Sequence, residues 1–149
     1  WAVSLGLEKR VFGSRGLMVD DARGLVFVNA PGGRLLARRL ADGQPMWSRA
    51  VVDDLFLAPD VAPGDTGYLG SITGGTVLMV DAVLYKPEGG APKREELFAL
   101  DPATGKTLWK QAFSGFAAAQ RDDASNGYLR VAGANGWTIV KVSPSGGIL

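Results

Sequence analysis

The fold is decided by residues 99–109, which read ALDPATGKTLW. The chain repeats this pattern at residues 37–47, which read ARRLADGQPMW, with alanine ten residues before tryptophan and glycine four residues before it. A third segment, Val140–Leu149, keeps the strand pattern and the glycine, at Gly146, but lacks the alanine and the aspartate. The polar–apolar alternation that follows the two tryptophans also follows Trp1. A pattern that recurs in one phase along a chain is typical of a repeat protein.

The tryptophan phase also sets the expected repeat boundaries. Cuts before each tryptophan divide the single segment 1–149 into repeats of approximately 1–46, 47–108 and 109–149. The first and last repeats are close to the period of about forty residues that is typical of a four-stranded propeller repeat. The middle repeat is longer, and its excess lies in Asp53–Thr66 and Lys86–Glu95. Both segments are rich in proline, glycine and charge, so we expect surface loop insertions there.

Short apolar runs separated by turn residues predict strands throughout the chain. The predicted strands are Gly24–Ala30, Arg34–Leu40, Thr76–Tyr85, Glu96–Asp101, Tyr128–Gly133 and Trp137–Val142. No segment keeps a helical period over three turns, and the best helix candidate, Phe113–Gln120, is short and contains Gly115. The pattern therefore predicts an all-β chain.

The repeated residues suit a contact that locks one sheet to the next. A four-stranded sheet cannot bury both faces alone, and radial stacking against neighbouring sheets leaves only short edges exposed. An indole ring buries a large area and its Nε1–H can reach a backbone carbonyl. A glycine allows a left-handed turn and the close approach of a ring. We predict this structural docking role for Ala37, Gly43, Trp47, Ala99, Asp101, Gly105, Trp109, Gly146 and Trp1.

The segment at residues 37–47 departs from the pattern of residues 99–109 in its turn. Arg39 stands where the later repeat has Asp101, and Asp42 takes the place of Thr104. Since Asp and Thr side chains cap turns through their oxygens, we expect this turn to be held differently.

The spacing Ala99-x-Asp101-x-x-x-Gly105-x-x-x-Trp109 resembles the tryptophan-docking motif of the PQQ-type (quinoprotein-like) β-propellers. The resemblance implies a partial β-propeller of about three four-stranded antiparallel blades. It also implies a protein that is exported, periplasmic or associated with the cell envelope. The family includes true quinoprotein dehydrogenases and outer-membrane assembly lipoproteins that bind no quinone, so the fold does not fix the function.

The composition excludes several classes of chemistry. The 149 residues include no cysteine and no histidine, which removes disulfides, thiolate nucleophiles, imidazole bases and metal sites built on those ligands. Sixteen basic residues meet fifteen acidic ones, for a net charge of +1, and no stretch has the basic density typical of nucleic-acid binding. The apolar runs are far shorter than a transmembrane helix requires.

One insertion carries a candidate metal site. Asp53, Asp54, Asp60 and Asp65 lie close together in sequence and carry the hard oxygen ligands that calcium prefers. They lack the spaced pattern of a calcium-binding loop, so loop solubility and turn capping form the alternative interpretation.

Two pairs of adjacent carboxylates and one further tryptophan have structural interpretations. Asp20/Asp21 and Glu95/Glu96 lie at the ends of expected strands, where neighbouring side chains point to opposite faces. We therefore expect solvated strand ends rather than catalytic pairs. Trp137 falls outside the docking phase and is expected to pack within its own blade.

These observations favour a non-catalytic propeller scaffold that mediates protein binding or assembly in an exported or envelope complex. No cofactor is predicted in this chain, and no segment matches the catalytic aspartate region of the quinoproteins. Two alternatives stay open. One is a fragment of a PQQ-dependent dehydrogenase, with PQQ and calcium, and the other is a propeller that binds a carbohydrate or another ligand.

The phase of the repeat also predicts what this chain contacts. The repeat begins on Trp1 and ends one residue before the next tryptophan position, so we expect the propeller to continue beyond this chain. Three blades leave two open sheet edges, which are prone to association. Further blades, copies of the chain or another protein subunit are expected to cover them.

Overall fold

The structure is a computed structural model that describes residues 16–113, 116–133 and 136–148, and the described residues form three antiparallel sheets. The first contains β1 (Leu17–Asp20), β2 (Leu25–Ala30), β3 (Arg34–Arg39) and β4 (Pro45–Ala50). The second contains β5 (Thr66–Thr73), β6 (Leu78–Tyr85), β7 (Arg94–Leu100) and β8 (Thr107–Phe113). The third contains β9 (Phe116–Arg121), β10 (Gly127–Gly133) and β11 (Gly136–Val142). In every sheet the strands follow one another in chain order.

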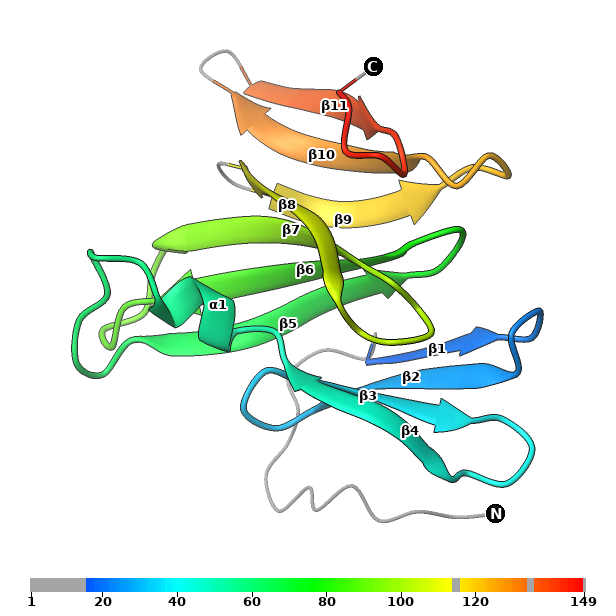
Figure 1. The fold of residues 1–149 in the computed structure, drawn as a ribbon. Helices are drawn as coiled ribbons and strands as arrows, with labels where there is room; N and C mark the ends of the chain where they lie inside the picture. The colour runs from blue at the N-terminus through cyan, green and yellow to red at the C-terminus, as the bar shows by residue number, and fades with distance from the viewer. Residues whose placement is uncertain (1–15, 114–115, 134–135, 149) are drawn as a thin grey trace.

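The three sheets stack face to face (Figure 1), with β5 lying beside both β1 and β9. The first strands of the sheets are therefore neighbours, as they are around the axis of a propeller. The prediction of an all-β partial β-propeller built from antiparallel sheets is confirmed, and two of the three described sheets have four strands.

The middle sheet is buried on both faces because its residues alternate between two cores. Leu78, Val80 and Leu84 of β6 belong to a cluster that includes Phe27 and Leu35 of the first sheet. The residue between two of them, Met79, belongs to a second cluster, together with Leu97 and with Leu129 and Val142 of the third sheet. A strand with two buried faces reads as a nearly continuous apolar run, which is how β6 appears in the sequence.

Each of the six predicted strands is present, with ends shifted by at most two residues. The helix candidate Phe113–Gln120 is not helical, because its described residues belong to β8 and β9, and β9 pairs with β10. A short helix, α1 (Asp53–Phe56), lies instead in the first insertion. Trp47 lies inside β4 and Trp109 inside β8, so the sequence cuts made before these residues pass through the fourth strand of a sheet.

No helix among the described residues is long and apolar enough to cross a membrane.

Candidate functional site

Trp47 reaches from the first sheet to a turn of the second. Its Nε1–H donates a hydrogen bond to the carbonyl oxygen of Pro102 at 2.9 Å. The ring lies against Gly105, whose φ is +71°, and a Cβ at that glycine would lie 2.7 Å from Trp47 Cε3. Arg49, also on β4, donates a hydrogen bond to the Gly105 carbonyl oxygen at 2.9 Å. One ring and two hydrogen bonds therefore join the two sheets at this turn.

Trp109 makes the same kind of contact one sheet later. Its Nε1–H donates a hydrogen bond to the carbonyl oxygen of Pro144 at 2.7 Å. A Cβ at Gly146, where φ is +90°, would lie 3.1 Å from the ring. Ala37 and Ala99 are buried and pair across the strands with Trp47 and Trp109. Trp1 lies outside the described residues.

The turns before the fourth strands of the first and second sheets are each closed by an aspartate, at different positions in the turn. In the second sheet, Asp101 Oδ1 accepts a hydrogen bond from the Ala103 N–H at 2.7 Å. In the first sheet, Asp42 Oδ1 accepts one from the Gln44 N–H at 3.0 Å, and Asp42 also pairs with Arg39 at 2.9 Å. The aspartate has moved along the turn, and Gly43 keeps a φ of +72° within it.

The first insertion begins inside the core. Val51, Val52 and Leu55 are at most 1% exposed, and they pack with the cluster between the first two sheets. The side chain of Val52 fills the space beside Gly33 and Gly67, where a Cβ would lie 1.4 Å and 2.4 Å from its methyl groups. The expectation that Asp53–Thr66 is a surface loop is therefore wrong for its first turn, because α1 anchors it between two sheets.

Beyond α1, the two insertions fold against each other. Lys93 forms an ion pair with Asp65 at 2.7 Å and also donates a hydrogen bond to the Asp60 carbonyl oxygen. Arg94 pairs with the Asp60 carboxylate at 2.7 Å. The hydrogen bond from the Ala62 N–H has the largest effect, and with the hydrogen bond from the Lys93 ammonium it holds the pKa of Asp65 below its ordinary value. We call the joined residues 53–66 and 86–95 the lobe.

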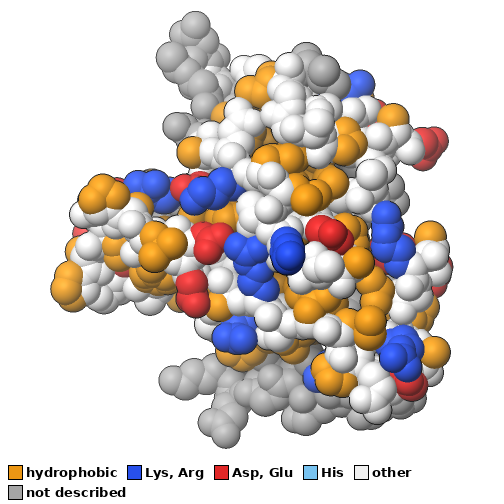
Figure 2. Space-filling view, in the orientation of Figure 1, with side chains coloured by type: hydrophobic (Ala, Val, Ile, Leu, Met, Phe, Trp, Pro, Cys, Tyr) orange, Lys and Arg blue, Asp and Glu red, His pale blue; other side chains and the backbone are white. Residues whose placement is uncertain are grey.

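The lobe projects from one end of the second sheet, at the left of Figure 2, and hydrophobic side chains gather on it. Leu57, just after α1, is 82% exposed, and Phe56 is also exposed. The lobe thus combines an outer apolar surface with a base that is anchored by ion pairs and by the buried residues around α1.

The four aspartates proposed for calcium are engaged separately. Asp53 lies exposed in the first turn of α1, and Asp54 pairs with Arg49 at 2.6 Å. Asp60 and Asp65 make the ion pairs of the lobe. Within the part of the chain that the structure describes, no three acidic residues gather as a metal ion would require. The structure does not bring these four side chains to one point.

The adjacent glutamates of β7 are buried, which overturns their expected role as solvated strand ends. Glu95 and Glu96 are each 6% exposed. Glu96 pairs with Arg94 at 3.4 Å and with Lys110 at 3.1 Å. Glu95 lies on the other face, where it lines a hollow together with Asp81 of β6. Sequence reasoning missed Asp81, although a lone aspartate within an apolar strand is a visible signal.

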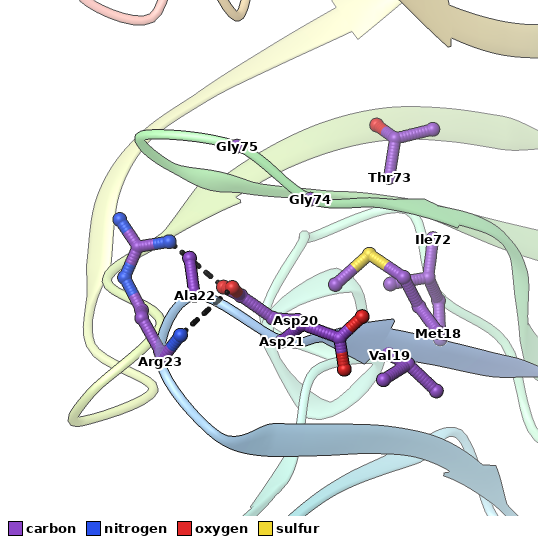
Figure 3. Close-up of a pocket in the computed structure, with 10 residues that line it drawn as sticks. All are labelled: Met18, Val19, Asp20, Asp21, Ala22, Arg23, Ile72, Thr73, Gly74 and Gly75. Carbon is purple, nitrogen blue, oxygen red and sulfur yellow. Dashed lines mark hydrogen bonds and ion pairs between the residues drawn. The ribbon is translucent and has the colours of Figure 1, made fainter.

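A second hollow lies between the β1–β2 turn and the β5–β6 turn (Figure 3). Asp20 accepts hydrogen bonds from the backbone N–H of Arg23 at 3.2 Å and from its guanidinium at 2.7 Å. Met18 approaches Gly74, where a Cβ would lie 2.5 Å from its Cε. The Asp20 carboxylate therefore closes its own turn, and Asp21 beside it is exposed.

The outer strand of the third sheet presents apolar side chains. Trp137 is 56% exposed and Ile139 is 73% exposed. The Arg130 guanidinium lies 4.2 Å from the centre of the Trp137 ring. Trp137 therefore packs against Arg130 of the neighbouring strand in its own blade, as predicted, while more than half of the residue remains exposed.

Comparison with known proteins places this fold among the propellers. No protein-family model and no curated protein matches the chain. Among solved structures, it superposes on a europium-containing methanol dehydrogenase with a TM-score of 0.59 and 17% identity over 91% of this chain. It superposes on the quinohemoprotein alcohol dehydrogenase from Comamonas testosteroni with a TM-score of 0.61 and 15% identity over 92% of this chain. BamB from Moraxella catarrhalis, at 15% identity over 95% of this chain and half of its own, gives a TM-score of only 0.37.

The chain spans 31% and 26% of the two dehydrogenases. The superpositions on these dehydrogenases support a PQQ-like propeller fold. At 15–17% identity they show similarity of fold only.

Proposed function

We propose that this chain is a segment of a PQQ-like β-propeller that binds or assembles other proteins in the periplasm or cell envelope. The lobe is its main contact surface. The observation that carries the proposal is the joining of the two insertions into one anchored projection that carries the exposed apolar residues Phe56 and Leu57.

A surface of this kind suits protein binding for a physical reason. Association costs free energy for every side chain and loop that must be ordered, so a pre-organised surface binds more tightly than a mobile one. Buried Leu55 and the Lys93–Asp65 ion pair fix the base of the lobe. Leu57 stays 82% exposed next to Phe56, which is also exposed, so the lobe presents apolar side chains to the solvent.

The tryptophan contacts provide the rigid frame in this proposal. Trp47 and Trp109 act as docking residues that tie successive blades together, with Gly105 and Gly146 as the surfaces on which the rings rest. Ala37, Ala99 and Asp101 shape the strands and turns around them, and Gly43 and Trp1 play the same roles for a preceding blade.

Further blades, copies of this chain or another subunit cover the outer faces of the end sheets. Trp137 and Ile139 support this part of the proposal, because these two large apolar side chains lie exposed on one face of β11 and suit a contact with another protein surface.

A fragment of a quinone-dependent dehydrogenase is the second candidate. The superposition on methanol and alcohol dehydrogenases favours it at the level of the fold. Its active residues, PQQ and calcium would then be held largely by parts of the protein outside this chain. Quinone-stimulated dye reduction by the purified native protein, with calcium added, would support this candidate over the scaffold.

Site-specific photo-crosslinking in native cells tests the scaffold directly. A photoreactive phenylalanine derivative replaces Leu57 in the lobe or, as the control, Leu108, which is 55% exposed on β8. We expect a discrete crosslinked protein from position 57 and none of that mass from position 108. Equal products from both positions, or none from position 57, would contradict the proposal.

A further inference from the structure

A hollow at the base of the lobe combines two buried carboxyl groups with two tyrosines. Asp81 and Glu95 line it from β6 and β7, and Tyr68 and Tyr85 line it from β5 and the end of β6. Asp81 follows the alternation of β6, so it shares its sheet face with Met79, which packs toward the third sheet. We call this hollow, with its volume of about 620 Å³, the acidic pocket.

The fold builds a space for the Asp81 carboxyl group but leaves one of its oxygens unpaired within the described part of the chain. Asp81 is 7% exposed, and its Oδ1 is buried with no hydrogen-bond partner among the described residues. Its Oδ2 occupies space that only glycine leaves free, because a Cβ at Gly70 would lie 2.1 Å away. A desolvated carboxylate is costly, and this cost falls when the group keeps a proton or when a donor from outside the fold pairs with it.

The rest of the lining favours an organic cation as that donor. Glu95 is 6% exposed and adds a second carboxyl group to the pocket. Tyr68 and Tyr85 lie edge to face with ring centres 6.0 Å apart, and their rings offer apolar surface on which an alkyl stem can pack. Tyr68 remains 53% exposed, so one ring is available at the mouth.

We propose that the acidic pocket binds a primary alkylammonium group, with Asp81 and Glu95 accepting its N–H hydrogen bonds and the tyrosine rings flanking its alkyl stem. The ammonium group belongs either to a free amine or to a lysine side chain of another protein. This inference does not depend on the lobe being a partner surface.

A bare metal ion fits the pocket less well. Calcium takes six to eight oxygen ligands, whereas the described residues contain no cluster of three acidic side chains anywhere. The volume of about 620 Å³ is also far larger than one ion requires. A primary ammonium, with three N–H donors and an alkyl stem, uses both the carboxyl groups and the rings.

The protonation of Asp81 agrees with this assignment. Burial, and then the nearby Glu95, raise the pKa of Asp81 to about 8, so the empty pocket holds a proton there at neutral pH. Burial and the two acidic groups also raise the pKa of Tyr85. Among the described residues, the other titratable groups at the pocket are Tyr68 and Lys86. A bound ammonium group takes the place of the proton.

Titration followed by two-dimensional amide NMR of the full chain tests the assignment. The probes are n-butylamine for a free amine, Nα-acetyl-lysine methylamide for a lysine side chain, and tetramethylammonium, which has no N–H, as the control. Lys86 lines the pocket with a positive charge. The Lys86→Gln variant should therefore bind the two primary amines several-fold more tightly than the wild type. Asp81→Asn, which keeps the shape, should bind them at least tenfold more weakly.

The outcomes separate the sources and decide the proposal. Saturable shifts centred on Asp81 and Glu95 with a primary amine, lost in Asp81→Asn, support it. Tighter binding of the lysine derivative assigns the pocket to a protein side chain, and tighter binding of butylamine assigns it to a free amine. The proposal is overturned if Lys86→Gln shows no saturable shift, if Asp81→Asn binds as well as the wild type, or if tetramethylammonium or calcium binds more tightly than both amines.

Discussion

Replacing Gly105 with alanine should loosen the contact between the first and second sheets. Gly105 has a φ of +71°, and the new Cβ would lie 2.7 Å from Trp47 Cε3 and 2.9 Å from its Cδ2. The left-handed backbone costs an alanine about 1 kcal/mol. Displacing the packed ring costs about 1–3 kcal/mol, and losing the Trp47–Pro102 hydrogen bond costs about 1 kcal/mol. We therefore expect Gly105→Ala to lower the free energy of unfolding by roughly 3–5 kcal/mol.

Gly32 provides a matched control for the backbone term. Its φ is +72°, and a Cβ there meets nothing within 4 Å. Gly32→Ala should therefore cost only about 1 kcal/mol. Urea unfolding of both variants, followed by circular dichroism, measures the difference. In a Trp47→Ala background, the cost of Gly105→Ala should fall to the level of the control. Equal costs for the two glycines in the wild-type background would refute the reasoning.

Three further predictions concern the second sheet and the lobe. Because Asp81 has a folded pKa of about 8 against an ordinary value of 3.8, the protein should lose stability as pH rises through this window, by roughly 6 kcal/mol in total. Asp81→Asn should remove that loss, as urea unfolding at pH 5 and pH 9 would reveal. Leu55→Ala should lower the free energy of unfolding by about 2–5 kcal/mol and Leu57→Ala by less than about 0.5 kcal/mol, although both residues lie in one insertion. Similar losses for the two variants in thermal unfolding would contradict the assignment of Leu55 to the core. Because the pKa of Asp65 is lowered, its carboxylate stabilises the fold at pH values above the ordinary aspartate pKa, and this stabilisation is lost on acidification. Lys93→Met should therefore show a smaller fall in Tm between pH 6 and pH 2 than the wild type.

The repeat was readable from sequence because its signals are local. Alanine, glycine and tryptophan recur at fixed spacing, and β6 has the apolar run of a strand buried on both faces. The sequence alone therefore predicts six of the strands and the propeller class. The turn that each tryptophan contacts could not be read from the local pattern, because the contact joins residues far apart in sequence. Trp47 packs on Gly105 rather than on Gly43 of its own segment.

The strands that sequence patterns missed depend on distant side chains. β5 contains Gly67 and Gly70, which weaken a strand pattern. The structure explains both glycines, because Val52 fills the space beside the first and Asp81 the space beside the second. Neither partner lies near its glycine in sequence, so local reasoning could not have found the strand.

The candidate sites were predictable only in part. The two insertions were recognisable by length and composition, but their union rests on pairing between Lys93 and Asp65 and between Arg94 and Asp60. Burial of Glu95 on the same face as Asp81 depends on the register between β6 and β7. A charged residue at a strand end is usually solvated, so the sequence alone favoured the wrong interpretation.

The most direct test of the central claim is the affinity for the protein that crosslinks to the lobe. Isothermal titration would compare the wild type with Leu57→Asp in the lobe and with Leu108→Asp on β8, both at exposed positions. A binding scaffold that uses the lobe predicts at least a tenfold weaker Kd for Leu57→Asp and an unchanged Kd for Leu108→Asp. Wild-type affinity in Leu57→Asp would contradict the account.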